Sequence, residues 1–482
     1  MKKDFCKLRT KRLLLAIVFG LFLVDFAAAS LNSRVNALLG KADQKKVVYG
    51  IKIIDADNKK KRYSFNSNQA MVPASNMKVI ITAAALKYLG SDYQFKTQIG
   101  LSGEDLVIVG SGDPLLGDKK TDEKYGRVSG WIFDDIANAL KEKNVTSIKN
   151  ILADTTIFDD ERVNPSWPVD QLNRWYACEV SGLNYYSNCV DMTVKVVNSR
   201  PRVFINPATS YLHIENQVSY TSNSKKSAVG AYRNSIANKI IVKGRCKSQE
   251  GPFDVAIERP AGFFAFLLAE NLSRAGISTE GNFTEKQLDS GEVVTLLKEY
   301  KSSIADCVIR CNKDSYGLAA ECLIKAVGAK RSGQNKNGGW ENGRKAVSAY
   351  LKGLGVNEKQ FYIDDGSGLS RKNRLSANAI TSVLYNVYHS NNKLFEKSLA
   401  VGGVEGTVSK RFAEKNYKGK VFCKTGYING VRTLSGWAKT SKGDYIFSIL
   451  TNNSNWKSKA VIDGIVKAII DEADGPGDKK KR

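Results

Sequence analysis

Ser75 and Lys78 are the two residues of this sequence whose types and spacing are best suited to covalent chemistry. They lie three positions apart, so on a helix both side chains occupy one face and the amine can reach the hydroxyl. Between Met77 and Leu86 only Lys78 and Thr82 are polar, which predicts a helix that is buried on nearly every side. Burial lowers the pKa of a lysine, and a neutral amine can serve as the base that activates a serine.

A Ser-x-x-Lys motif is weak by itself, because the serine can simply cap a helix while the lysine extends into solvent. Two further motifs follow it in this chain, Ser315-Tyr-Gly317 and Lys424-Thr-Gly426. In this order the three resemble the motifs of penicillin-binding proteins and serine β-lactamases. The long separation of Ser75 from Ser315 resembles in particular peptidase family S13, the D-alanyl-D-alanine carboxypeptidase/endopeptidases, which are low-molecular-mass class C penicillin-binding proteins.

The resemblance extends over nearly the whole chain after residue 29. Further stretches that look like the family are Gly110–Pro114, Ala153–Phe158, Asp365–Arg371 and Gly403–Thr407. It implies an α+β protein with a penicillin-binding/serine β-lactamase-like fold, in which helices flank an antiparallel five-stranded sheet built from both chain ends. Two smaller domains are expected to be inserted after the first motif.

The family pattern implies that the reaction passes through an acyl-enzyme. Ser75 would be the nucleophile, Lys78 its base, and Ser315 the relay that brings a proton to the leaving amine. The resemblance implies no metal and no cofactor. Acyl transfer also needs donors for the developing oxyanion, and the pattern assigns these to the backbone amides of Ser75 and Tyr427.

The substrate contacts that the family pattern implies are Lys424, Thr425, Gly426, Tyr427, Asp154, Phe158, Arg371 and Asn429. Lys424 and Thr425 match positions that hold the terminal carboxylate of D-Ala, and Gly426 would let the substrate approach the strand edge closely. The other side chains would border the site for the peptide side chain. Phe158 can also be a core residue, and the turn sequence Asn429-Gly explains that asparagine without a substrate.

Gly317 departs from the family pattern, in which the second motif is Ser-x-Asn. Glycine has no side-chain amide to contact Lys78 or a substrate carbonyl. Replacing it with asparagine is expected to restore that donor. Alternatively, the glycine is there for a positive φ, or Tyr316 fills the space. Three function classes therefore remain: a D-Ala-D-Ala carboxypeptidase or endopeptidase of peptidoglycan stem peptides, a serine β-lactamase, and a catalytically weakened wall-binding homologue.

The elements that must position these residues are predicted from hydrophobic periodicity and turn signals. Expected strands are 47–54, 62–65, 421–426, 431–440 and 445–452. Expected helices are 77–89, 129–143, 260–275, 296–311, 318–327 and 458–471. The predicted catalytic domain comprises 30–95 and 255–474, around an inserted β-rich region of two small domains at 96–254, with a disordered basic tail at 475–482.

The first 29 residues resemble an export signal, with a basic start, an apolar run from Leu13 to Val24 and three alanines before Ser30. Export to the periplasm or cell envelope is expected, and an uncleaved anchor is the alternative. An oxidising compartment permits disulfides, for which Cys178 and Cys189 are the candidates, while Cys307 and Cys311 are expected to be buried thiols.

The formal net charge of +25 points to contact with anionic envelope surfaces or simply to solubility. Because the protein is expected to be exported, nucleic acid is not an expected partner; the family resemblance implies peptidoglycan peptides and β-lactam antibiotics instead. The two histidines, His213 and His389, have no metal-binding spacing, and no phosphate-binding loop motif occurs. The oligomeric state stays open.

Overall fold

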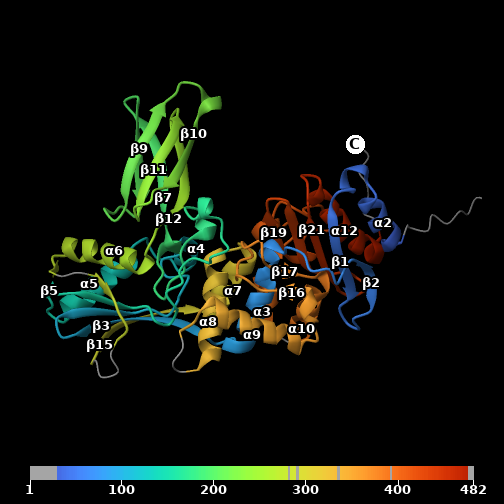
Figure 1. Cartoon of the computed structure of the whole chain (residues 1–482), viewed down its shortest axis with the longest axis horizontal. Helices are drawn as coiled ribbons and strands as arrows, with labels where there is room; N and C mark the ends of the chain where they lie inside the picture. The colour runs from blue at the N-terminus through green and yellow to red at the C-terminus, as the bar shows by residue number, and fades with distance from the viewer. Residues whose placement is uncertain (1–29, 281–282, 289–292, 334–336, 391–392, 476–482) are drawn as a thin grey trace, which may run out of the picture.

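A single antiparallel sheet joins the two ends of the chain (Figure 1). The computed structural model describes residues 30–280, 283–288, 293–333, 337–390 and 393–475. The sheet has six strands in the order β18-β19-β20-β21-β1-β2. Their bounds are Ala400–Val401, Val421–Ile428, Val431–Ala438, Tyr445–Asn452, Val48–Asp55 and Lys61–Phe65. The expected five strands are present, and the two-residue edge strand β18 is the addition.

The hairpins of this sheet follow the predicted turn sequences. Ile428 pairs with Val431, so Asn429 and Gly430 form a two-residue turn in which Gly430 has a φ of 74°. Alternate residues of β21 face opposite sides, because Ile446 and Leu450 join one core while Phe447 and Ile449 join another. The sheet therefore separates two layers of helices.

Helices cover both faces of this sheet. One face carries α2 (Leu31–Leu39) and α12 (Ser458–Asp474), and the other carries α10 (Ala377–His389) and α3 (Met77–Leu89). The predicted bounds of α3 are confirmed. No helix among the described residues is long and apolar enough to cross a bilayer.

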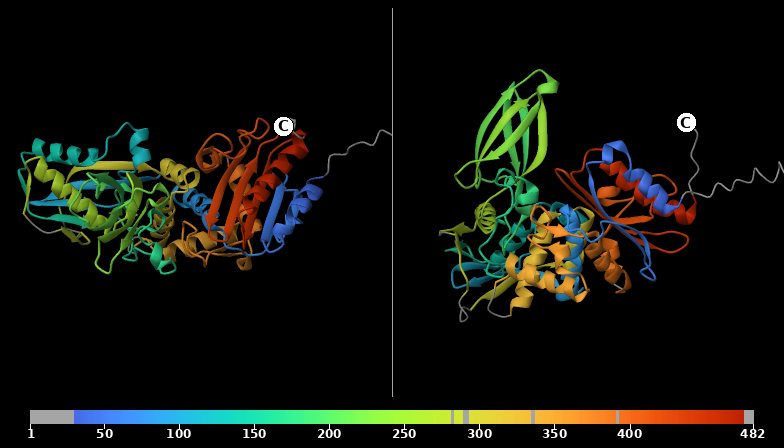
Figure 2. Two further views of the ribbon diagram at one scale, coloured as in Figure 1. Left: turned by 90° about the horizontal axis from the view of Figure 1, so that it is seen from above. Right: turned by 45° about the vertical axis from the view of Figure 1, so that its right-hand side comes forward.

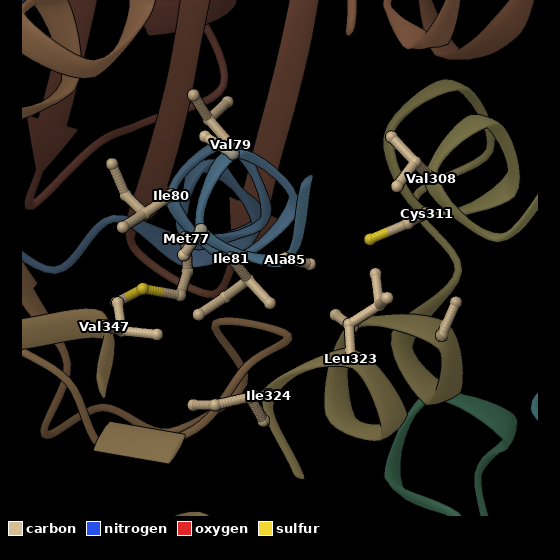
Figure 3. Close-up of a cluster of buried hydrophobic side chains, with 14 of the residues drawn as sticks. Met77, Val79, Ile80, Ile81, Ala85, Val308, Cys311, Leu323, Ile324 and Val347 are labelled. Carbon is tan, nitrogen blue, oxygen red and sulfur yellow. The ribbon is translucent and has the colours of Figure 1, made fainter. Parts of the chain in front are cut away.

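Helix α3 is enclosed by other helices, as its apolar sequence predicts. Every residue from Met77 to Leu86 is buried. Figure 3 shows its side chains packed against residues of α7 (Ile304–Lys313), α8 (Gly317–Ser332) and α9 (Trp340–Gly353). The helix that begins just after Ser75 is thus fixed by helices from the second half of the chain.

A second sheet, in the order β14-β6-β4-β3-β15, forms the body on the left of Figure 1. Its strands are Phe283–Glu285, Ile151–Asp154, Asp105–Val109, Gln94–Ser102 and Thr295–Ser303. Two helices, α5 (Trp131–Glu142) and α6 (Pro260–Arg274), pack on it with their own core. Two short strands, β5 (Ser147–Ile148) and β13 (Ser278–Thr279), pair beside it.

Two elements differ from the prediction. The segment expected as one helix over 296–311 is strand β15 followed by α7, because Thr295 to Ser303 pairs antiparallel with β3. Helix α6 was expected in the catalytic core, yet it packs against α5. We therefore propose a catalytic domain of 30–93 and 304–474 and an insertion of 94–303, longer than the expected 96–254.

A β-module projects from the insertion, as Figures 1 and 2 show. It combines the sheets β12-β7-β8 and β10-β11-β9. Their strands are Gln249–Ala256, Cys189–Val197, Arg200–Asn206, Ala228–Arg233, Lys239–Cys246 and His213–Tyr220. The remaining elements are α4 (Lys119–Lys124), β16 (Phe361–Tyr362), β17 (Arg374–Leu375) and α11 (Lys393–Ser398).

The predicted disulfide between Cys178 and Cys189 is wrong, because both are free and buried. The segment between them is closed by hydrogen bonds instead: Asn188 Nδ2 donates to Glu179 O and to Asn184 Oδ1, each at 2.8 Å. Cys307 and Cys311 are buried thiols, as expected. The expected export signal (1–29) and residues 476–482 of the expected tail lie outside the described residues.

Candidate active site

Ser75 lies in a single 3-10 turn, Ala74–Asn76, that leads directly into α3. Its hydroxyl makes no helix-capping bond and instead accepts a hydrogen bond from Lys78 Nζ at 3.2 Å. Asn76 fixes the turn to the sheet, because its Nδ2 donates to the carbonyl of Lys424 at 2.7 Å. The first and third motifs are thereby in direct contact.

Lys78 is only 2% exposed. Its Nζ donates to Ser75 Oγ and, at 2.6 Å, to the carbonyl oxygen of Ser367. Burial lowers its pKa, against a smaller opposite effect of the Glu321 and Asp365 carboxyls. A buried amine with a lowered pKa and a hydroxyl within reach is the arrangement that base-assisted acyl transfer requires.

Ser315 and Lys424 form the second pair of the site. Lys424 Nζ donates to Ser315 Oγ at 2.9 Å and to the carbonyl of Thr425 at 2.8 Å. Burial, assisted by the nearby positive charge of Lys78, lowers the pKa of Lys424 to about 7. Ser315 has a φ of 62°, a conformation that costs a non-glycine residue of order 1–3 kcal/mol and that clusters at functional sites.

A cleft of about 670 Å³ contains Ser75, Lys78 and Ser315. It is also lined by four of the predicted substrate residues, Arg371, Thr425, Tyr427 and Asn429. Strand β18 pairs with β19 only at Phe422 and Cys423, so no strand of the described residues pairs with that edge of β19 from Lys424 onward. That edge borders the cleft and offers its backbone groups to an extended peptide.

Gly426 lets strand β19 approach the Ser75 turn. A Cβ on this residue would lie 2.1 Å from Thr433 Oγ1 and 3.0 Å from the carbonyl oxygen of Pro73. The glycine is thus required for packing inside the protein, whereas the sequence suggested close approach of a substrate. The guanidinium of Arg371 donates to the carbonyl of Asn429, which joins two sides of the cleft.

The structure does not bring Asp154 and Phe158 to the cleft. Asp154 ends β6, and its Oδ1 accepts bonds from the amide and hydroxyl of Thr156. Phe158 is 2% exposed and fills the space above Gly112, where a Cβ would come within 2.2 Å of its ring. Both are structural residues of the insertion.

Residues farther along the same loop line the cleft instead: Pro168, Gln171, Trp175 and Tyr176. Trp175 is 41% exposed, an unusual position for a large aromatic side chain. The sequence held a signal for this segment, because tryptophan and tyrosine occur together in a polar loop rich in turn residues. Sequence reasoning also missed Thr407 and Ser367.

Gly317 begins α8 with a φ that is not positive. A Cβ there would lie 3.5 Å from the carbonyl oxygen of Tyr176, an ordinary contact. The ring of Tyr316 does not fill the space, because its hydroxyl donates to the carbonyl of Pro114. The carbonyl of Ser367 accepts a hydrogen bond from Lys78, and the expectation that an asparagine at position 317 would add a donor stays a prediction.

Glu321 fixes the segment Gly366–Ser367 through hydrogen bonds to its backbone amides. Its carboxylate accepts bonds from the amides of Ser367 at 2.7 Å and Gly366 at 2.8 Å, and from Trp340 Nε1 at 2.8 Å. Burial, reinforced by the Asp365 carboxyl, raises the pKa of Glu321 to about 7. Glu321 therefore positions the carbonyl to which the base of the site is bonded.

Metal-ligating side chains do not gather within the described ranges: no group of three or more His, Cys, Asp or Glu residues there could hold an ion. His213 is on the projecting β-module, and His389 Nε2 lies 2.8 Å from the carbonyl oxygen of Ala56.

Comparison with known proteins gives consistent matches. Residues 31–471 match the family described as D-Ala-D-Ala carboxypeptidase 3 (S13). The sequence is 28% identical over 472 residues to a D-alanyl-D-alanine carboxypeptidase of Actinomadura sp. (strain R39), covering 92% of this chain and 85% of that protein. It is 24% identical over 405 residues to the D-alanyl-D-alanine carboxypeptidase DacB of Haemophilus influenzae, covering 79% and 80%.

A crystal structure of penicillin-binding protein 4 (dacB) from Haemophilus influenzae shares the fold. The TM-score is 0.77 at 22% identity, covering 91% of this chain and 98% of that chain. The predicted fold class, helices around an antiparallel sheet with inserted domains, is confirmed by this likeness and by the topology.

Proposed function

The chain belongs to the D-Ala-D-Ala carboxypeptidase 3 (S13) family of serine-type hydrolases, and from this membership and the cleft we propose that it cleaves D-Ala-D-Ala peptide bonds through an acyl-enzyme on Ser75. One observation carries the assignment: the buried amine of Lys78 lies 3.2 Å from Ser75 Oγ inside an open cleft. The relatives named above are D-alanyl-D-alanine carboxypeptidases, which supports the same substrate class for this chain.

Acylation begins at the Ser75 hydroxyl. Its oxygen attacks the carbonyl carbon of the penultimate D-Ala while Lys78 Nζ takes the hydroxyl proton. The resulting oxyanion accepts hydrogen bonds from the backbone amides of Ser75 and Tyr427. Both residues line the cleft, as this role requires.

Collapse of the tetrahedral intermediate breaks the carbon–nitrogen bond. The leaving amine needs a proton, which passes to it from Lys78 by way of the Ser315 hydroxyl, and this makes Lys78 neutral again. Lys424 Nζ holds that hydroxyl through a hydrogen bond. Water then attacks the ester on Ser75 while Lys78, now neutral, takes a proton from that water. When the ester bond breaks, Lys78 returns the proton to Ser75 Oγ and the acid product leaves. Serine and lysine return to their starting states.

Substrate orientation comes from β19. An extended peptide pairs with the free edge from Lys424 to Ile428, and the hydroxyl of Thr425 and the charge of Lys424 hold its terminal carboxylate. Trp175, Arg371 and Asn429 line the part of the cleft toward the acyl side, where a peptide side chain would lie. We assign them, in place of Asp154 and Phe158, to side-chain recognition.

Gly317 does not argue for an inactive homologue. Lys78 has a hydrogen-bond acceptor in the carbonyl of Ser367, so its amine is held in place although residue 317 has no side-chain amide. We therefore favour a working enzyme over a wall-binding protein that has lost catalysis. The match to a carboxypeptidase family does not favour the β-lactamase alternative.

β-Lactams are proposed inhibitors, acting on the same serine. The Haemophilus penicillin-binding protein 4 has a crystal structure in complex with a β-lactam. We also propose export to the periplasm or cell envelope, as wall peptides would require, and contact of the basic surface with anionic envelope components.

Labelling with fluorescent penicillin followed by denaturing electrophoresis separates the three function classes. A stable fluorescent adduct that disappears in Ser75→Ala is the expected result. Rapid turnover of the penicillin without an adduct would identify a β-lactamase. A folded protein without label or turnover would contradict the proposal and leave the wall-binding alternative.

A further inference from the structure

The turn that carries Ser315 is held by residues outside the cleft. It consists of Asp314, Ser315 and Tyr316, which join α7 to α8. Ser315 has a φ of 62°, and a residue other than glycine keeps such a conformation only where its surroundings enforce it. The contacts around the turn therefore decide where the Ser315 hydroxyl lies.

Arg310, in the last turn of α7, contacts the residue on each side of Ser315. Its backbone carbonyl accepts hydrogen bonds from the amides of Asp314 at 3.3 Å and Tyr316 at 3.2 Å. Its guanidinium donates to the Asp314 carboxylate and lies 4.8 Å from the centroid of the Tyr316 ring. The main chain and the side chain of one residue thus close the turn around Ser315.

Asp118, a residue of the insertion, fixes the guanidinium of Arg310. Arg310 Nε donates to Asp118 Oδ2 at 2.9 Å and Nη2 donates to Oδ1 at 2.7 Å, so the pair is bidentate. Such a pair fixes the orientation of both groups as well as their distance. Asp118 is only 2% exposed, and leaving a buried carboxylate without its partner is costly. Arg310 is therefore held in one position.

The same segment of the insertion reaches the turn at two further points. The hydroxyl of Tyr316 donates to the carbonyl of Pro114 at 3.1 Å. Lys120 Nζ donates to Asp314 Oδ1 at 2.7 Å. Both residues that flank Ser315 are thus bonded to the insertion as well as to α7.

We infer that Arg310 and Asp118 are positioning residues for Ser315, and that the insertion thereby takes part in the reaction. Neither side chain lines the cleft, so their effect on the reaction is transmitted through the turn. The inference rests on the proposed function, in which Ser315 passes a proton to the leaving amine. For that step the Ser315 hydroxyl has to stay at its hydrogen-bond distance of 2.9 Å from Lys424 Nζ.

Arg310→Lys and Asp118→Asn test the pair in the full-length protein. Lysine keeps the positive charge but cannot form the bidentate contact. Asparagine removes the negative charge, yet it remains a good N-cap for α4, where Asp118 accepts from the amide of Thr121 at 3.0 Å. Each variant is expected to lower the second-order rate of acylation by fluorescent penicillin about tenfold.

Lys124→Met is the matched control. Lys124 also lies on α4 and donates to Asp306 in the first turn of α7, so it joins the same two helices at the end of α7 opposite to Ser315. Its acylation rate is expected to stay within about twofold of the parent. A loss as large as that in Arg310→Lys would overturn the inference, because contact between the helices would then set the rate.

Ser315→Ala separates positioning from a purely structural role. If Arg310 acts through the Ser315 hydroxyl, Arg310→Lys lowers the acylation rate of Ser315→Ala by less than about twofold, against about tenfold in the parent. Equal losses in the two backgrounds would indicate a structural role and overturn the inference. Unchanged rates in both Arg310→Lys and Asp118→Asn would do the same.

The same measurements keep the inference separate from the proposed function. A Ser315→Ala protein that is acylated at the parent rate contradicts the relay role on which the inference depends. A slow Ser315→Ala protein with equal losses in both backgrounds contradicts the positioning alone. Thermal melting of each variant checks folding, and if Arg310→Lys does not fold, Asp118→Asn in the two backgrounds gives the same comparison.

Discussion

Lys78 Nζ donates a hydrogen bond of 2.6 Å to the carbonyl oxygen of Ser367, shorter than its 3.2 Å contact with Ser75 Oγ. The base is therefore anchored by backbone as well as by the nucleophile it serves. Because Glu321 in turn fixes the amide of Ser367, the orientation of the amine depends on a buried carboxylate outside the cleft.

Ser75→Ala should remove acylation completely, because within the described part of the cleft this is the hydroxyl bonded to the buried Lys78 amine. The measurement is the second-order rate of labelling by fluorescent penicillin. Thermal melting of the variant serves as the control for folding. Label retained at the parent rate would show that another residue is the nucleophile.

Lys78→Arg should be nearly as damaging, since a guanidinium stays protonated and cannot accept the proton of Ser75. We expect the acylation rate to fall at least about a hundredfold, equivalent to about 2.7 kcal/mol of barrier. Stopped-flow acylation by a chromogenic β-lactam measures it. A rate within about tenfold of the parent would contradict the role of Lys78 as base.

Gly317→Asn is expected to slow acylation severalfold. The added amide would compete with Ser367 for Lys78 and would have to share space with the backbone of Tyr176, whose carbonyl oxygen lies 3.5 Å from the Cβ position. Gly317→Ala is the matched control, and its rate should stay within about threefold of the parent because a Cβ alone fits. Faster acylation by Gly317→Asn would restore the interpretation of a missing donor.

Glu321→Gln should lower both stability and activity. Its carboxylate accepts three hydrogen bonds, and the amide of glutamine offers only one acceptor oxygen, so a buried donor is left unpaired at a cost of about 1–3 kcal/mol. The melting temperature and the pH profile of acylation are the measurements. A positioning role predicts a displaced pH profile, because Lys78 loses its fixed acceptor geometry and a nearby carboxylate. A lower melting temperature with an unchanged profile would limit Glu321 to a structural role.

Lys424 should make stability depend on pH in a specific window. Its folded pKa of about 7 lies below the unfolded value of about 10.4. Between these pH values the unfolded chain binds more protons than the folded protein does. The contribution of Lys424 to the free energy of unfolding therefore rises with pH. The stability of Lys424→Met relative to the parent should therefore decrease from pH 7 to pH 10. Chemical denaturation of both proteins across that range checks it, and a constant difference would contradict the lowered pKa.

Much of the catalytic arrangement could be predicted because its parts are local in sequence. Ser75 and Lys78 are three residues apart, at the turn that leads into α3 and in its first turn, and the turn at Asn429-Gly430 marks the hairpin that carries Lys424. The sequence could not show that the carbonyl of Ser367 would accept a hydrogen bond from Lys78, since a backbone contact does not depend on the residue type.

The wrong prediction of a helix over 296–311 and the misplaced residues Asp154 and Phe158 have one physical cause: each depends on tertiary contacts. The segment from Thr295 to Ser303 is a strand because it pairs with β3, far away in the chain, and no local pattern contains that partner. Asp154 and Phe158 do not reach the cleft, because resemblance identifies a stretch of chain, while the direction of each side chain depends on what packs around it.

The enclosure of α3 has a consequence for biosynthesis. The helix is synthesised before the whole insertion, yet the helices that bury it, α7, α8 and α9, come after residue 303. Until the ribosome has made them, an apolar helix has no partner, and contacts between segments so distant in sequence form slowly. The nascent chain therefore carries an apolar segment without these helices while the insertion is made, and Lys78 gains its acceptor in Ser367 only after that residue has been synthesised. The buried setting of the hydroxyl–amine pair thus depends on chain that is synthesised more than two hundred residues after the pair itself.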